Sequence, residues 1–329
     1  MKAMVLRAWG SPQVLRLEDV PEPEVGEHDV LVEVRAAAVN PVDCKIRQGG
    51  MGQQRAFPVI LGFDVSGVVR QVGPRVQGLK EGDEVYASPS LIRQGANAQY
   101  VAVDARTVAP KPGNLSHTQA AVLPLVTITA WEALHRRAGI HPGETVLIHA
   151  GGGGVGHIAI QLAKLHGCRV LTTASQPGSI ELCRKLGADV VINYAQEDVV
   201  RRVMEETNNQ GCSVVLDAVG GEVFVQSLDC VAVHGRLVTI LPPPPDAPIA
   251  KLFLKDATIA QEFMGAPAMF NTHPEAQGQI LQTVAELVEA RKLMPHVSHV
   301  FPLEELPKAH QQQETRHTVG KIAIEVSQG

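Results

Sequence analysis

Six residues in the middle of the chain have the types and spacing of a nucleotide-phosphate loop. Residues 151–156 read Gly-Gly-Gly-Gly-Val-Gly, matching G-x-G-x-x-G between a β-branched run and an apolar helical pattern. Since a diphosphate reaches backbone N–H groups at a helix N-terminus only where no Cβ blocks it, Gly151 and Gly153 would expose those groups. Gly156 would let helix and strand touch. The predicted dinucleotide-binding residues of the loop are Gly151, Gly153, Gly154, Val155 and Gly156.

The residues about 20 positions further on indicate which dinucleotide is bound. An Asp or Glu there would bind the adenosine-ribose 2′-hydroxyl and repel a 2′-phosphate. Residues 172–175 read Thr-Thr-Ala-Ser, so a 2′-phosphate is tolerated and Ser175 offers a hydroxyl donor. No Lys or Arg lies between Arg169 and Arg184, and Ser175 is equally well explained as an N-cap or loop serine. The prediction is NADPH, with NADH the less favoured cofactor.

The loop belongs to a strand–helix alternation that is typical of a doubly wound parallel sheet. Runs that are apolar throughout, such as Val214–Leu216, suit strands buried on both faces. The predicted strands are Thr145–His149, Arg169–Thr173, Val190–Asn193, Val214–Ala218, Arg236–Leu241 and Thr258–Phe263, and the predicted helices are Val155–His166, Ile180–Leu186, Val199–Thr207 and Val223–Val231.

The first 120 or so residues predict a different architecture, a mostly antiparallel β-barrel. Short alternating strands are separated there by Gly- and Pro-rich turns. The predicted strands are Val30–Ala36, Gly67–Val72, Glu84–Ala87 and Ala98–Val103. After the sixth Rossmann strand, Gln277–Arg291 and Glu304–His310 have helical patterns and Lys321–Val326 reads as a strand. We expect this tail to return to the first domain.

Composition limits which classes of partner and which cellular compartment are expected. The 329 residues carry a formal charge of -5 without a basic block, so neither nucleic acid nor an anionic membrane surface is an expected partner. The five cysteines include no C-x-x-C pair, which argues against a disulfide framework and a zinc knuckle. No signal peptide or 20-residue apolar stretch is visible, and the expectation is a cytoplasmic protein.

The order of these parts resembles the medium-chain dehydrogenase/reductase superfamily, and within it the zinc-independent quinone oxidoreductases related to zeta-crystallin. The resemblance covers nearly the whole chain. It implies a GroES-like catalytic domain from residues 1–123 and 266–329, a Rossmann domain from residues 124–265, an active site in the cleft between them, and a homodimer paired through Rossmann edge strands. The matching segments are 38–43 (AVNPVD), 58–67 (PVILGFDVSG), 123–131 (LPLVTITAW), the glycine loop, 186–189 (LGAD), 217–221 (DAVGG) and 320–322 (GKI).

The resemblance also shows where metal ligands are missing. Zinc alcohol dehydrogenases of the superfamily carry Cys where this chain has Asn40, and His where it has Phe63. Catalytic zinc generally needs three protein donors, so no zinc is expected. Without a Lewis acid, reduction of an activated acceptor is favoured over alcohol oxidation. The expected reaction is hydride transfer from NADPH to a small quinone or α,β-unsaturated carbonyl. Alternatives are an enoyl-thioester or alkenal reductase, and a low-turnover NADPH-binding sensor or structural protein.

Candidate site residues follow from the same resemblance. Asn40 and Asp43 would lie beside the nicotinamide as catalytic residues, although Asn-Pro-x-Asp reads equally well as a capped helix start. Thr127 would contact the nicotinamide side of the cofactor, or bond back to the preceding helical turn. Tyr194 would lie by the adenosine phosphate, or be an ordinary half-exposed aromatic at a strand end. An apolar substrate pocket is predicted from Met51, Phe63, Phe263 and Met264, each of which singly is better explained by core packing.

Overall fold

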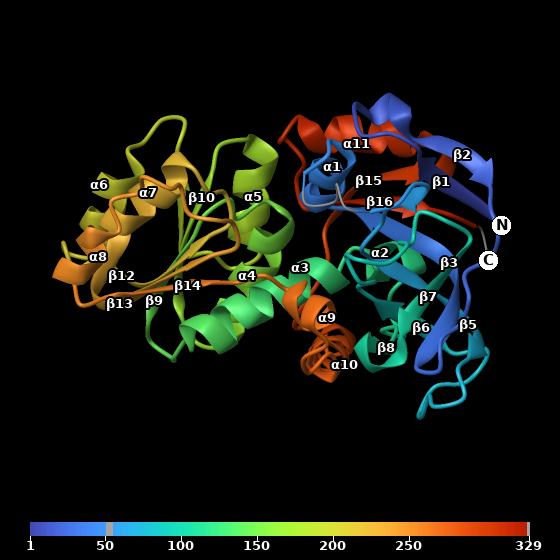
Figure 1. Ribbon diagram of the computed structural model, residues 1–329. Helices are drawn as coiled ribbons and strands as arrows, with labels where there is room; N and C mark the ends of the chain where they lie inside the picture. Colours follow the sequence, from blue (N-terminus) through green and yellow to red (C-terminus); the bar gives the residue numbers. More distant parts are fainter. Residues whose placement is uncertain (51–54, 328–329) are drawn as a thin grey trace. The chain divides into compact units, whose positions relative to one another are not determined.

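The chain divides into two compact units, shown in the computed structural model of Figure 1, which describes residues 1–50 and 55–327. Unit 1 comprises Met1–Leu125 and Gly265–Gly329, and unit 2 comprises Val126–Met264. Both ends of the chain therefore contribute to one unit, and the central segment forms the other.

Unit 2 is built around a six-stranded parallel sheet with the strand order β11-β10-β9-β12-β13-β14. Numbered along the chain from its first strand, this is the order 3-2-1-4-5-6 of a doubly wound dinucleotide-binding fold, as predicted. Its centre is apolar, with Leu147, Leu171 and Val215 fully buried. The strands are β9 (Thr145–Ile148), β10 (Arg169–Ala174), β11 (Val190–Asn193), β12 (Cys212–Asp217), β13 (Val231–Thr239) and β14 (Thr258–Gln261).

Helices lie between successive strands of this sheet, since parallel neighbours need crossover connections. After α3 (Pro124–Trp131) the chain continues as a π-helical segment, Glu132–Ala138, which the sequence pattern did not predict. Strand β13 begins five residues before its predicted start, because Val231 pairs with Cys212 ahead of a register shift. The other helices of unit 2 are α4 (Gly154–Leu165), α5 (Pro177–Lys185), α6 (Val199–Glu206), α7 (Glu222–Cys230) and α8 (Ala250–Leu254).

Unit 1 contains a seven-stranded sheet and a three-stranded sheet that are antiparallel except for one pair of strands. The larger sheet has the order β15-β16-β3-β5-β6-β8, with β7 also paired to β3, and the smaller has the order β2-β1-β4. The strands are β1 (Lys2–Leu6), β2 (Arg16–Asp19), β3 (Asp29–Val39), β4 (Val59–Ile60), β5 (Val65–Val72), β6 (Glu84–Ala87), β7 (Tyr100–Asp104), β8 (Val108–Pro110), β15 (Val297–Pro302) and β16 (Lys321–Glu325).

The C-terminal tail completes this unit. Strand β16 pairs antiparallel with β3, with Ile322 opposite Val39. This register brings Lys321 next to the start of α1 (Pro41–Arg47), the helix that follows β3. The remaining helices of the unit are α2 (His117–Ala121), α9 (Ala266–Phe270), α10 (Glu275–Glu289) and α11 (Leu306–Glu314). In the described part of the chain, no helix has the length and apolar character needed to span a membrane.

Candidate functional site

The glycine loop of unit 2 is shaped first by close packing. A Cβ on Gly156 would lie 2.2 Å from the carbonyl oxygen of Ala150, and one on Gly151 would lie 2.0 Å from Oγ1 of Thr172. Neither separation is possible for a real Cβ, so helix α4 can approach β9 and β10 this closely only with glycine at both positions. A Cβ on Gly153 would meet a single atom, the Ala150 oxygen, at 3.2 Å. Most of the space above Gly153 is therefore open.

The N–H groups available to a phosphate differ from those expected. Gly151 donates its N–H to the carbonyl of Thr173 in β10 at 3.0 Å, and Gly153 donates to the carbonyl of Ala150 at 2.9 Å, so both groups already have backbone partners. Helix α4 begins at Gly154, and no side chain caps it because its N-cap residue is Gly153. The N–H groups of the first helical turn, including those of Gly154 and Val155, lack a carbonyl four residues earlier in the helix. Together with the positive end of the helix dipole, these groups could bind an anion.

Two predicted adenosine-side residues follow neighbouring strands at the same edge of the sheet. Ala174, the last residue of β10, pairs with Asn193, the last residue of β11. Ser175 and Tyr194 therefore occupy adjacent positions beyond the carboxyl ends of the strands, where nucleotides bind in such sheets. Ser175 is half-buried and Tyr194 is 56% exposed. The N-cap of α5 is Gln176, so Ser175 is not the capping residue that the sequence left as an alternative.

Thr127 has a buried hydroxyl without a partner. The residue lies in α3 and is fully buried, and within the described residues its Oγ1 makes no hydrogen bond. The expected alternative, a bond back to the preceding helical turn, is therefore not formed. A buried hydroxyl that is left unpaired costs about 1–3 kcal/mol, so a ligand that pairs with it gains that energy.

His149 is a second such group, and the sequence patterns did not single it out. It follows β9 directly, is 2% exposed, and lies with Nδ1 3.4 Å from Oγ1 of Thr173. Its Nε2 has no partner among the residues that the structure describes. Burial lowers the pKa of His149 to about 4, and the nearby Asp217 carboxylate opposes that shift only weakly. The imidazole is therefore neutral at pH 7, and its position two residues before the loop was the signal that could have singled it out.

In unit 1, a buried cluster of four polar side chains surrounds the start of α1. Asn40 accepts a hydrogen bond at Oδ1 from Nζ of Lys321 and donates from Nδ2 to Oδ2 of Asp64 at 2.7 Å. The Asp64 carboxylate also accepts from Lys321 Nζ at 3.1 Å and from the backbone N–H of Leu125 at 2.7 Å. All four side chains are at most 3% exposed. We call this set, Asn40, Asp43, Asp64 and Lys321, the buried cluster.

Asp43 caps the helix within this cluster. Its Oδ2 accepts from the backbone N–H of Asn40 at 2.8 Å, and its Oδ1 accepts from the N–H of Gly62 at 3.0 Å. Desolvation raises the pKa of Asp43 to about 7, although both backbone bonds and the Lys321 ammonium favour the charged form. Burial likewise raises the pKa of Asp64, opposed chiefly by Lys321. Asp64 and Lys321, 257 positions apart, were missed as site residues because no local pattern connects them.

The predicted pocket residues lie in different environments. Phe63 is fully buried in the core of unit 1, together with Leu61 and Val65. At the end of unit 2, Phe263 is 38% exposed and Met264 is buried. Met51 lies outside the described residues.

Comparison with known proteins supplies the family. Residues 26–113 match the model of the alcohol dehydrogenase GroES-like domain, and residues 186–324 match that of the zinc-binding dehydrogenase. A zinc-type alcohol dehydrogenase-like protein of Staphylococcus aureus is 36% identical over 93% of this chain and 92% of its own. The chain belongs to the medium-chain dehydrogenase/reductase superfamily. It is an oxidoreductase of that superfamily with the GroES-like and Rossmann domains that its sequence predicted.

Two further proteins match nearly all of this chain. The 2-methylene-furan-3-one reductase of Solanum lycopersicum is 36% identical over 98% of this chain and 79% of its own. The crystal structure of the Escherichia coli quinone oxidoreductase complexed with NADPH matches with a TM-score of 0.89 and 28% identity, over 99% of this chain and 100% of that one.

The two positions at which the resemblance leads one to expect zinc ligands hold residues that do not fit a metal. The Asn40 amide is engaged with Lys321 and Asp64, and Phe63 is an apolar core residue. Neither is a usual zinc donor. Across residues 1–50 and 55–327, no three His, Cys, Asp or Glu side chains are grouped so that they could hold a metal ion.

Proposed function

We propose that this protein transfers a hydride from NADPH to a quinone or an α,β-unsaturated carbonyl without zinc. The observation that carries the proposal is the state of the two zinc-ligand positions, since Asn40 is committed to an internal hydrogen-bond network and Phe63 to the core. A substrate that needs a Lewis acid to polarise it finds no donor set for one there. Quinones and enones are electrophilic without a metal, and the tomato and E. coli relatives are named for acceptors of these two kinds.

The cofactor proposal rests on the carboxyl edge of the unit 2 sheet. The first-turn N–H groups of α4 would hold the diphosphate, and the hydroxyl of Ser175 would bind a 2′-phosphate, which no carboxylate at the end of β10 repels. The unpartnered Thr127 hydroxyl and the neutral His149 imidazole fit polar groups of the same ligand. When bound, NADPH supplies the hydride.

Asn40 and Asp43 act in this proposal as positioning residues. Both oxygens of Asp43 accept backbone N–H groups, so protonating it for catalysis would break the cap of α1. Asn40 holds Asp64 and Lys321 together and thereby fixes the segment that joins β3 to α1. The reduced acceptor would take its proton from water, which balances the transferred hydride.

The test is a steady-state comparison of acceptors with NADPH followed at 340 nm. The panel contains a benzoquinone, a naphthoquinone, an enone and the saturated ketone that corresponds to the enone, with the reverse oxidation of the matching alcohol by NADP⁺ as a further arm. Turnover of a quinone or the enone, with the saturated ketone and the alcohol at background, is the expected result. Turnover of the alcohol alone would overturn the proposal. Tight NADPH binding without any turnover would favour a sensor over a reductase.

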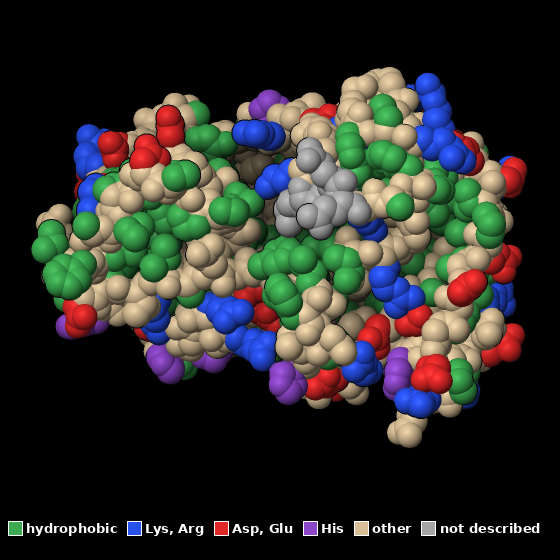
Figure 2. Space-filling model, in the orientation of Figure 1, with side chains coloured by type: hydrophobic (Ala, Val, Ile, Leu, Met, Phe, Trp, Pro, Cys, Tyr) green, Lys and Arg blue, Asp and Glu red, His purple; other side chains and the backbone are tan. Residues whose placement is uncertain are grey.

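We further propose that the protein is a homodimer paired through unit 2. Strand β14 is the last strand of the sheet, and Ile259 on it is 38% exposed. Phe253 and Leu254 of the neighbouring α8 are 86% and 85% exposed, and Figure 2 shows hydrophobic side chains gathered over the position that α8 has in Figure 1. An exposed apolar patch beside an open strand edge suits pairing with a second copy.

The test of the dimer is light scattering. The unmodified protein should have twice the mass of one chain, and the variant F253D/L254D should have the mass of one chain. A monomeric unmodified protein would contradict the proposed dimer.

A further inference from the structure

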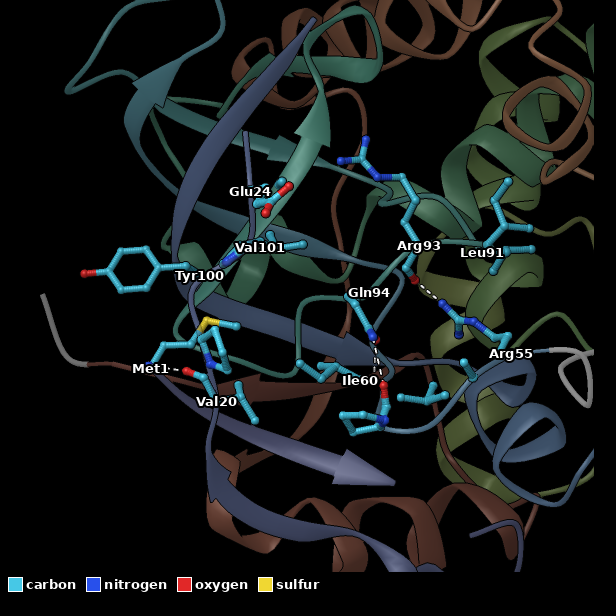
Figure 3. Close-up of a pocket in the computed structure, with 18 of the residues that line it drawn as sticks. Met1, Val20, Glu24, Arg55, Ile60, Leu91, Arg93, Gln94, Tyr100 and Val101 are labelled. Atoms are coloured by element: carbon cyan, nitrogen blue, oxygen red, sulfur yellow. Dashed lines mark hydrogen bonds between the residues drawn. The ribbon is translucent and has the colours of Figure 1, made fainter. Parts of the chain in front are cut away.

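Unit 1 contains a large cavity that the hydride-transfer proposal does not use. Its volume is about 1140 Å³, the size of a site for a small organic molecule. Apolar side chains from several segments form much of the wall, among them Val20, Ile60 of β4, Leu91 and Val101 of β7 (Figure 3). An apolar ligand body would therefore be well accommodated.

Arg55 gives this cavity a charged group whose pairing is incomplete. Its Nη2 donates to the backbone carbonyl of Arg93, while its Nη1 is buried without a hydrogen-bond partner in the described parts of the chain. Desolvation lowers the pKa of Arg55, and no described carboxylate lies close enough to oppose that shift. Arg55 is half-buried, and a buried guanidinium nitrogen without a partner is unfavourable, so an anion placed at Nη1 would be stabilised.

The other charged side chains of the described cavity wall do not neutralise Arg55. Arg93 is already neutralised, because its two terminal nitrogens donate to the two oxygens of Asp29 at 2.8 and 2.6 Å. Glu24 is exposed, and Figure 3 shows it on another side of the cavity from Arg55. Among the described lining residues, Arg55 is therefore the one guanidinium without a carboxylate.

We propose that the cavity binds an amphipathic small molecule with a single carboxylate, which pairs with Arg55 while its apolar body lies against Ile60, Leu91 and Val101. A guanidinium with a free N–H edge suits a planar carboxylate better than a single point charge does. A ligand with several phosphates would need more cations than the described wall offers. The site lies within unit 1 and requires no hydride transfer, so ligand binding there can be tested independently of the proposed reaction.

The experiment measures binding of 4-phenylbutyrate and of its neutral amide to the full-length protein by titration calorimetry. The acid should bind the unmodified protein at least tenfold more tightly than the amide. Arg55→Gln should bring the two ligands to equal affinity, and Arg55→Lys should keep part of the preference. The control is Arg16→Gln, which removes the same charge from an exposed position of β2 and should leave the preference intact.

Three results would overturn the proposal. They are equal affinity of the acid and the amide for the unmodified protein, no binding of either, and an unchanged preference in Arg55→Gln. If that variant does not fold, the salt dependence of the unmodified protein decides: binding of the acid should weaken between 50 and 500 mM NaCl while binding of the amide does not. Equal salt dependence of the two ligands would overturn the proposal as well.

Discussion

The buried cluster of unit 1 and two buried polar groups of unit 2 differ in how completely they are paired. In the buried cluster of unit 1, Lys321, Asn40 and Asp64 satisfy one another and Asp43 is satisfied by backbone N–H groups. In unit 2, Thr127 Oγ1 and His149 Nε2 have no described partner, and α4 has no side-chain cap. Since native proteins pair nearly all buried polar groups, the first arrangement indicates structural support, and the second leaves polar atoms that a ligand could pair with.

The largest expected effect comes from removing the cation of the buried cluster. Lys321→Met leaves the buried Asp64 carboxylate without its cation, and should lower the free energy of unfolding by about 3 kcal/mol or more. The control is Lys308→Met, because Lys308 is exposed and pairs with Glu305 on the surface, and it should cost less than about 1 kcal/mol. Urea unfolding measures both. Equal stability of the two variants would show that the cluster contributes nothing.

The next effect is a dependence of stability on pH from His149. Its pKa is about 4 in the folded protein and about 6.5 in an unfolded chain, so the unfolded state binds more protons between these values. The stabilisation is complete above about pH 6.5 and is lost as the pH falls through 4, an effect of up to roughly 3 kcal/mol. His310, with its pKa lowered to about 3 by burial, acts in the same direction.

His149→Gln should therefore reduce, without abolishing, the loss of stability between pH 6.5 and pH 4. His317→Gln, at an exposed histidine, is the matched control and should follow the unmodified protein. Urea unfolding at four pH values measures the slope. A slope in His149→Gln equal to that of the control would mean that His149 is solvated and charged in the folded protein.

Cofactor choice should respond to charge at the end of β10. Ser175→Asp places a carboxylate where the 2′-phosphate would bind, and should weaken NADPH binding at least tenfold, about 1.4 kcal/mol, while leaving NADH binding nearly unchanged. Gln210→Glu adds the same charge before the amino end of β12, at the opposite edge of the sheet, and should affect neither cofactor. Fluorescence titration gives both affinities. An unchanged NADPH affinity in Ser175→Asp would remove Ser175 from the phosphate site.

The smallest expected effect on stability comes from removing the unpaired hydroxyl of Thr127. Thr127→Val removes a buried hydroxyl that has no described partner, so stability should be unchanged or higher by up to about 1 kcal/mol. NADPH affinity should fall severalfold, and Thr127→Ser should retain it. Thermal unfolding and cofactor titration are the two measurements. A loss of 2 kcal/mol of stability would show that the hydroxyl is paired within the protein.

Local sequence patterns predicted the parts of this molecule whose interactions are local. The six strands of unit 2 follow from alternating apolar runs and helices, and the pattern around Gly151–Gly156 was sufficient to place the glycine loop between β9 and α4. Strands β1, β2, β4, β8 and β15 were not predicted. They are short or half exposed, and several are held by partners far along the chain, such as Val5 of β1 opposite Ile60 of β4.

The candidate site was predictable only in part, for the same reason. The residue types Asn40 and Phe63 were read from the sequence. The hydrogen bonds that Lys321 and Asp64 make with the Asn40 amide could not be read from it, because they depend on the pairing of β16 with β3. The unpaired state of Thr127 and His149 is a property of three-dimensional packing. The π-helical segment Glu132–Ala138 likewise continues an apolar helix without any local signal for the change.

The most direct test of the central claim is turnover measured together with zinc content. The protein is treated with a chelator, its zinc is determined by mass spectrometry, and NADPH oxidation with a quinone and an enone is followed before and after zinc is added back. We predict turnover that is undiminished at far less than one zinc per chain and unaffected by added zinc. Activity that falls with the metal and returns with it would contradict a zinc-free reaction at Asn40 and Phe63.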